Sequence, residues 1–159
     1  VAGLSSLMAG DIRWQSLSVA ADCQRFQRDV LFLGHLAGIK SALTVAENLQ
    51  ILAACRGTPL SDDRLATALT RVGLLGYDDT PVAQLSAGQK RRVALARLFT
   101  EAPLLWLLDE PFTAIDQAGV SELEGWLADH AEQGGMVLLT THHRLNMRCP
   151  VLPIELIPA

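Results

Sequence analysis

Two stretches of sequence decide the fold: residues 84–92, Gln-Leu-Ser-Ala-Gly-Gln-Lys-Arg-Arg, and residues 104–111, Leu-Leu-Trp-Leu-Leu-Asp-Glu-Pro. In the first, Ser86 and Gln89 stand at capping-box spacing, which predicts a helix from Ser86 to about residue 100. In the second, an apolar run without a polar residue predicts a strand that is buried on both faces of a parallel sheet. A helix N-terminus can hold an anion, and a strand that ends in two carboxylates can hold a metal ion and a water. Together they indicate half of a nucleotide-hydrolysis site.

Strands and helices alternate along the rest of the chain. Apolar runs predict further strands at residues 30–33 and 136–139, and a short strand at residues 10–14. Capping residues and glycine stops predict helices at residues 44–57, 61–73 and 116–134, while residues 1–8 fit the end of another helix. This alternation predicts an α/β fold with a parallel sheet, in a single domain of 159 residues.

Composition excludes several classes of function. The net charge is -4 and no long basic run is present, so nonspecific nucleic-acid binding is not favoured. No apolar run approaches the length of a membrane span, and no signal peptide is recognised. The three cysteines, Cys23, Cys55 and Cys149, lack a paired metal spacing, and we expect buried thiols in a reducing compartment.

The turn at residues 84–89 can bind phosphate. A helix N-terminus exposes unpaired N–H groups and the positive end of its dipole, and Gly88 allows close approach of the backbone. The Ser86 hydroxyl can donate to an oxygen of the anion. For a bare Ser-x-x-Gln, however, an ordinary capped helix is the simpler interpretation.

Two carboxylates follow the strand at residues 104–108. Asp109 ends the strand, where ligands bind in open α/β sheets, and its hard oxygen suits Mg²⁺, directly or through water. The side chain of Glu110, the next residue, points in a different direction from that of Asp109 and can polarise an attacking water. The alternative is a pair of solvated carboxylates at a strand end.

The sequence contains no phosphate-wrapping P-loop. Such a loop needs Gly-x-x-x-x-Gly-Lys-Ser/Thr, and the two lysines, Lys40 and Lys90, do not stand in that pattern. We therefore expect that this 159-residue chain does not hydrolyse ATP alone and that it is an N-terminally truncated piece.

The string Leu-Ser-Ala-Gly-Gln at residues 85–89, with the arginines after it, resembles the signature motif of the ATP-binding-cassette (ABC) ATPases. Asp109 and Glu110 follow Ser86 at the family's spacing and resemble its Walker B aspartate and catalytic glutamate. The resemblance implies the P-loop NTPase fold, with ATP and Mg²⁺ as ligands. It also implies that Ser86, Gly88 and Gln89 contact nucleotide, and that Asp109 serves Mg²⁺.

Two further segments extend the resemblance. Residues 113–116, Thr-Ala-Ile-Asp, match the D-loop, which in relatives crosses the dimer interface and which includes Asp116; as a plain turn, Asp116 would only cap a helix. His142, after the last apolar strand, matches the switch histidine, which in relatives reaches toward the γ-phosphate. The resemblance implies that Glu110 and His142 are the catalytic residues. His143 is expected to be structural. His35 stands where relatives have a glutamine that senses Mg²⁺ and the membrane partner; it either takes that role or is a loop histidine.

Residues 33–40, Leu-Gly-His-Leu-Ala-Gly-Ile-Lys, are similar to a segment of one subfamily, the ATP-binding subunits of the haem exporter of cytochrome c maturation (CcmA type). The resemblance covers residues 1–146, with a helical subdomain at about 40–100 and a tail of unclear structure at 147–159. It implies a homodimeric ATPase on the cytoplasmic face of the bacterial inner membrane, docked on a transmembrane permease. No Cys-x-x-Cys-His or other direct haem site is seen.

Two other interpretations stay open. The chain can be a degenerate, non-catalytic cassette that binds a permease, or a cassette ATPase for another small substrate. An in-frame P-loop upstream supports the enzyme, and neighbouring genes for a permease and for cytochrome maturation identify the substrate.

Overall fold

The computed structural model describes residues 9–35, 38–101 and 103–155. Three parallel strands form its central sheet in the order β3 (Val30–Leu33), β4 (Leu105–Asp109) and β5 (Met136–Thr140). Leu33 lies beside Leu108, and Asp109 lies beside Thr140. Helical segments connect the strands, so the predicted α/β fold with a parallel sheet is confirmed. The register brings the carboxyl ends of all three strands to one edge.

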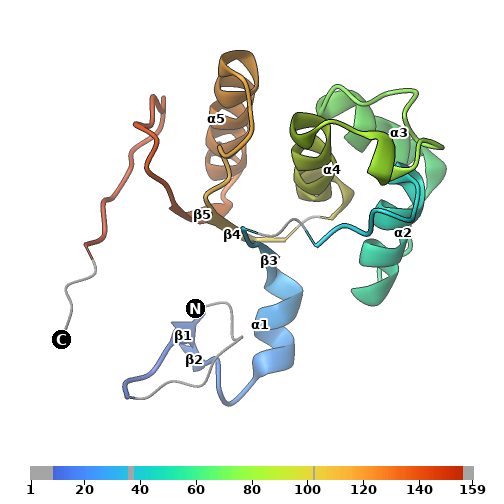
Figure 1. Ribbon diagram of the computed structural model, residues 1–159. Coiled ribbons are helices and arrows are strands. Elements are labelled where there is room, and N and C mark those ends of the chain that lie inside the picture. The colour runs from blue at the N-terminus through green and yellow to red at the C-terminus, as the bar shows by residue number, and fades with distance from the viewer. Residues whose placement is uncertain (1–8, 36–37, 102, 156–159) are drawn as a thin grey trace.

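Helices cover one face of the sheet. Helices α4 (Ala87–Thr100) and α5 (Gln117–Glu132) stand on that face in Figure 1, with α2 (Val45–Cys55) and α3 (Asp62–Arg71) beyond α4. Alternate strand residues face them: Leu31, Leu33, Trp106 and Leu108 belong to one core with the buried side of these helices. A short 3₁₀ turn, η1 (Val82–Gln84), leads into α4.

The opposite face carries a smaller core. Helix α1 (Cys23–Asp29) and the hairpin of β1 (Arg13–Trp14) and β2 (Leu17–Ser18) lie there, below the sheet in Figure 1. Phe26 of α1 packs with the strand residues Leu105 and Leu107. The strand β4 is therefore buried on both faces, as its apolar sequence predicts.

The predicted caps set the helix starts. Ser86 and Gln89 form a reciprocal capping box at α4, and Thr44 and Glu47 form another at α2. The Asp116 carboxylate accepts from the Gly119 N–H at the start of α5. Each pair satisfies N–H groups that the first helical turn would leave unpaired, which is why these boundaries follow the sequence closely.

Strand β5 differs from the fully buried strand that its apolar sequence suggests. Met136 is 45% exposed and Leu138 is 37% exposed, while Val137 and Leu139 face the helical core. Among the described strands β5 pairs only with β4, so it forms an edge of the described sheet. Apolar composition alone does not distinguish an edge strand from a central one.

Three sequence expectations need comment. The prediction of buried thiols is wrong for Cys23 and Cys55, which are exposed because they begin and end short helices; Cys149 is partly exposed. Helix α1 was not predicted, because its seven residues are too few to show a helical pattern. The expected helix end at residues 1–8 lies outside the described residues.

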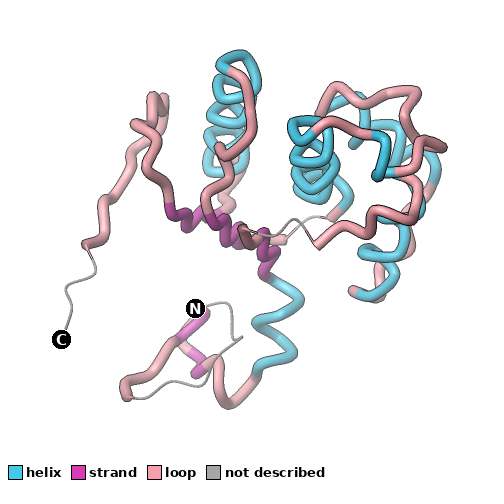
Figure 2. The backbone as a smooth tube through the Cα atoms, in the orientation of Figure 1, coloured by secondary structure: helices cyan, strands magenta, loops and turns pink. Residues whose placement is uncertain are grey.

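The chain after β5 forms no helix or strand within residues 141–155 and appears as a long loop in Figure 2. It is nevertheless attached to the fold. Arg148 forms ion pairs with Asp129 and Glu132 of α5, and Met147 packs against the larger core. No helix within the described ranges is both long enough and apolar enough to cross a membrane.

Candidate functional site

The carboxyl edge of the sheet gathers the polar residues that follow β4 and β5. The Thr140 hydroxyl donates to Asp109 Oδ1 at 2.7 Å, which fixes the carboxylate at the end of β4. The Glu110 N–H donates to the Thr140 carbonyl at 3.1 Å. Thr140 was not singled out in the sequence, although the parallel register places it beside Asp109.

Glu110 and His142 lie next to each other at this edge. Glu110 Oε1 is 3.5 Å from His142 Nε2, and the His142 N–H approaches Glu110 Oε2 at 3.4 Å. The His142 side chain is 99% exposed and the Glu110 side chain is 26% exposed, so both can reach a ligand from solvent. Two residues that are 32 positions apart in the sequence are therefore brought together.

The backbone at Glu110 is unusual. Its φ is +45°, in the left-handed region that non-glycine residues seldom adopt. This turn directs the chain away from the strand immediately after Asp109. The following residue, Pro111, has no N–H with which to close such a turn.

The Arg91 side chain of α4 donates two hydrogen bonds to that turn. Its Nη2 donates to the Glu110 carbonyl at 2.8 Å and its Nε donates to the Pro111 carbonyl at 3.1 Å. The residue is only 7% exposed. Burial lowers the pKa of the Arg91 guanidinium, and the nearby negative charge of Asp109 opposes that shift.

The N-terminus of α4 presents donors to solvent. Ser86 Oγ accepts from the Gln89 N–H, and Gln89 Oε1 accepts from the Ser86 N–H. Because Ser86 Oγ accepts in this pair, its hydroxyl proton remains available to donate to a ligand. Within the described part of the chain, no partner is found for the N–H groups of Ala87 and Gly88, the first two residues of the helix.

The same turn lies against the loop that precedes α5. A Cβ placed on Gly88 would stand 3.3 Å from the carbonyl oxygen of Ala114, itself a residue with positive φ. Arg92, one position after Arg91, donates to the Val72 carbonyl and to Glu122, and it lies 3.8 Å from Asp116. Helix α4 therefore contacts the loop between β4 and α5 along its length, from Glu110 to Asp116.

His35 and His143 are two further histidines near the strand ends. His35 is exposed after β3, at the same edge of the sheet, but no contact to the other candidate residues is found within the described ranges. His143 lies beside Phe112, with ring centres 5.0 Å apart, and 3.6 Å from Glu124. Its ring is partly buried, and it lines the same open hollow as Glu110.

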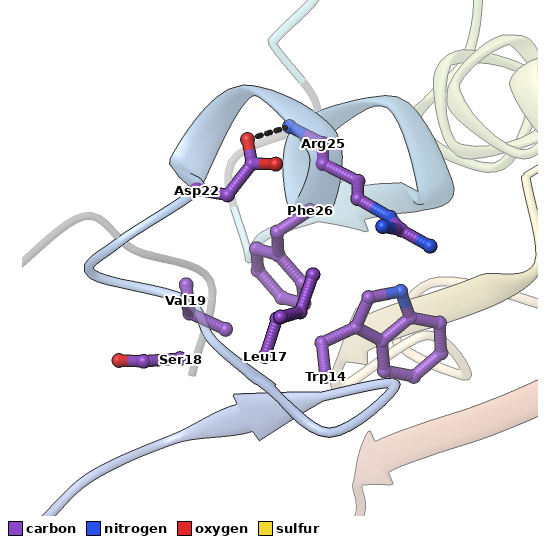
Figure 3. Close-up of a pocket in the computed structure, with 7 residues that line it drawn as sticks. All are labelled: Trp14, Leu17, Ser18, Val19, Asp22, Arg25 and Phe26. Carbon is purple, nitrogen blue, oxygen red and sulfur yellow. Dashed lines mark hydrogen bonds between the residues drawn. The ribbon is translucent and has the colours of Figure 1, made fainter.

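Two hollows stand out among the described residues, and neither forms a closed ligand pocket. The cavity in Figure 3, between Trp14, Phe26 and their neighbours, has a volume of about 10 Å³, which is room for about one water. A second, open hollow is lined by Glu110, Phe112 and His143 among others. The candidate site is therefore an exposed surface at the strand ends.

The described residues include no cluster of three or more acidic, histidine or cysteine side chains able to hold a metal by themselves. Mg²⁺, however, is commonly bound by one or two carboxylates together with phosphate oxygens and waters. Asp109 supplies a fixed, partly exposed carboxylate of that kind. The residues present fit a magnesium ion that arrives with a nucleotide.

Comparison with known proteins agrees with the geometry. Residues 1–113 match the ABC transporter family. The chain is 51% identical over 152 residues to the cytochrome c biogenesis ATP-binding export protein CcmA of Vibrio cholerae, covering 96% of this chain and 73% of the relative. It is 48% identical to the CcmA protein of Pseudomonas fluorescens, covering 92% of this chain and 69% of the relative.

A solved structure of a dimeric ATP-binding cassette, in a post-hydrolysis state with ADP and Pi, superposes with a TM-score of 0.77 at 21% identity. The match covers 89% of this chain and 66% of the solved one, and it shows the fold alone. The family match and the identity to CcmA proteins decide the assignment: the chain belongs to the ATP-binding subunits of ABC transporters, an ATP-hydrolysing family, and within it to the CcmA type.

Proposed function

We propose that this chain supplies the catalytic edge and the signature helix of an ATP-hydrolysing subunit in an ABC transporter. The observation that carries the proposal is the pairing of Glu110 with His142 at 3.5 Å, beside a fixed Asp109. Glu110 is the base that polarises the attacking water, and His142 holds the Glu110 carboxylate and reaches toward the γ-phosphate.

The other candidate residues take roles around that centre. Asp109 would hold Mg²⁺ together with the nucleotide phosphates, where the ion neutralises charge that develops on them. Ser86, Gly88 and Gln89 present a helix N-terminus to the phosphates. The capping box engages the N–H groups of Ser86 and Gln89, and within the described ranges no partner is found for those of Ala87 and Gly88, which supports this role.

We further propose that two such subunits form a dimer, with the turn at residues 86–89 of one subunit facing the nucleotide of the other. Asp116 lies in the loop that would cross the interface. His35, exposed at the same edge of the sheet, either senses the nucleotide and the membrane partner or is a loop residue. The subunit would dock on a transmembrane permease at the cytoplasmic face of the inner membrane.

The cargo proposed for the transporter is haem, for cytochrome c maturation. The name shared by the relatives, cytochrome c biogenesis export protein, supports this assignment. It can be tested in a bacterium that lacks its own CcmA, by measuring covalent haem in its c-type cytochromes after the full-length gene is supplied. Restored haem attachment supports haem delivery, and unchanged cytochromes alongside normal expression contradict it.

The catalytic assignment is tested by Glu110→Gln in the full-length cassette. The amide keeps the shape of the side chain but is not a base, so turnover should fall by about 10² to 10⁴-fold while nucleotide binding survives. The fold should be unaffected, since the Arg91 bonds go to backbone carbonyls that the substitution retains. Turnover within a few-fold of the wild type means that Glu110 is not the base.

A further inference from the structure

Arg91 is a buried cation that the proposed mechanism does not use. It stands in the second turn of α4, five residues after the Ser86 cap, and it is 7% exposed. Its guanidinium reaches out of the helix to the loop after β4 rather than to a carboxylate side chain. Two of its nitrogens donate to consecutive backbone carbonyls, those of Glu110 and Pro111.

Those carbonyls belong to the turn that aims the Glu110 side chain. Glu110 adopts a φ of +45°, a conformation that persists only when its surroundings hold it. Its N–H is fixed by the Thr140 carbonyl, and its own carbonyl accepts from Arg91 and, at 3.3 Å, from the Thr113 N–H. Arg91 is the side chain that holds the turn on its C-terminal side, where Pro111 offers no N–H.

We propose that Arg91 is a positioning residue for catalysis: by clamping the carbonyls of Glu110 and Pro111, it holds the Glu110 carboxylate in place against His142. The inference rests on the proposed role of Glu110 as the base. It also means that the helix whose N-terminus faces nucleotide is joined, within one subunit, to the residue that acts on the water.

The fork of the guanidinium is what this role requires. A planar guanidinium offers several donors in fixed directions, so it can hold two carbonyls at once. A lysine at the same position has a single nitrogen and cannot reproduce both bonds with the same geometry. Arg92 carries the same charge on the same helix but donates to Val72 and Glu122, so it has no part in this clamp.

The experiment is a double-mutant cycle in the full-length cassette. Arg91→Gln and Arg91→Lys are made alone and combined with Glu110→Gln, and Arg28→Gln serves as the matched control. Arg28 is an exposed arginine of α1, and no side-chain bond of it is found within the described residues. Steady-state kcat and KM, nucleotide affinity, single-turnover hydrolysis of labelled ATP and thermal stability are measured for each variant.

We expect Arg91→Gln to lower kcat by roughly 10-fold to 100-fold, the scale of a misplacement of about 1 Å, with KM and nucleotide affinity changed less than about twofold. Arg91→Lys should lie between Arg91→Gln and the wild type, and Arg28→Gln should match the wild type. In the Glu110→Gln background, Arg91→Gln should cause no further loss, because the group it positions is already inactive.

Equal losses in both backgrounds would mean that Arg91 acts independently of Glu110, and the inference is then overturned. A kcat for Arg91→Gln within twofold of the wild type overturns it as well. If Arg91→Gln does not fold, Arg91→Lys carries the same comparison. Failure of the proposed function is distinct from both outcomes, since it shows in Glu110→Gln alone.

Discussion

A single negative charge at position 88 should abolish ATP hydrolysis while the protein remains folded. Gly88 is the second residue of α4 and its φ is not in the left-handed region, so other residues can adopt its backbone conformation. An acidic residue in the first turn of a helix is favourable by about 0.3–1 kcal/mol. Against this gain, a Cβ at position 88 stands 3.3 Å from the Ala114 carbonyl oxygen, so that loop must shift slightly, and we expect the thermal stability to change little.

The same negative charge should weaken the binding of nucleotide. A carboxylate about 4 Å from a phosphate oxygen costs about 4 kcal/mol at an effective dielectric constant of about 20. That energy corresponds to a loss of roughly 10³-fold in affinity for the bound phosphate. Part of any loss is steric, because a Cβ at this position stands 3.3 Å from the Ala114 carbonyl.

Gly88→Asn and Gly88→Ala separate charge from shape. Asparagine has the size of aspartate without the charge, and alanine adds only the Cβ that meets Ala114. In an ATPase assay of the full-length cassette we expect Gly88→Ala to lose a few-fold, Gly88→Asn somewhat more, and Gly88→Asp to be inactive. If the Asn and Asp variants are equally inactive, the electrostatic argument is refuted.

Mixing subunits tests whether the turn acts on the partner's nucleotide. A dimer of one Gly88→Asp subunit and one Glu110→Gln subunit has one site with both lesions and one site with neither, if the site is shared between subunits. Such a mixture should regain part of the wild-type activity, whereas each homodimer is inactive. An inactive mixture in which heterodimers form means that each site is built within one subunit or that both sites must work together. A crosslink from Ser86→Cys to the partner's P-loop distinguishes these cases.

Three further predictions concern the chain itself. The purified 159-residue chain should release phosphate no faster than its Glu110→Gln variant; steady release well above that control contradicts the expectation from the missing P-loop motif. Burial lowers the pKa of His130, so the folded state binds fewer protons than the unfolded chain, and the free energy of unfolding should fall as the pH drops below about 6.5. In a denaturation series at several pH values, His130→Gln should reduce this dependence. A Cβ on Gly135 would overlap the His130 ring, so Gly135→Ala should lower the free energy of unfolding by about 1–3 kcal/mol through lost stacking and hydrogen bonding. A Cβ on Gly125 of α5 meets no atom within 4 Å, so Gly125→Ala should raise the free energy of unfolding by about 0.5–1 kcal/mol in the same denaturant titration.

Local patterns in the sequence predicted the elements that depend on local interactions. The caps at Ser86 and Asp116 begin their helices because the capping bonds join residues three positions apart. Strand β4 was predicted because burial on both faces requires a continuous apolar run. Helix α1 and the hairpin at residues 13–18 were missed or incomplete, since segments of two to seven residues carry too little periodicity.

The contacts within the candidate site were harder to predict, because many of their partners are backbone atoms. Arg91 donates to two carbonyls, and every residue has a carbonyl, so no residue type marks the acceptor in the sequence. The positive φ of Glu110 has no sequence signal either, since glycine is the residue that normally marks such a turn. The bond from Thr140 to Asp109, in contrast, could have been foreseen from the register of two parallel strands.

The sequence therefore indicated the two halves of the site but not the contacts that join them. The signature motif at residues 85–89 and the Walker B strand at residues 104–109 are each recognisable alone, because each is a continuous stretch. Their connection runs through three neighbouring residues of α4: Gly88 lies against the Ala114 loop, Arg91 holds the Glu110 turn, and Arg92 reaches Asp116. Because one rigid helix carries all three contacts, a shift of its N-terminus on meeting a phosphate would act on the Glu110 turn and on the loop before α5 at the same time. The double-mutant cycle at Arg91 measures the first of these two connections.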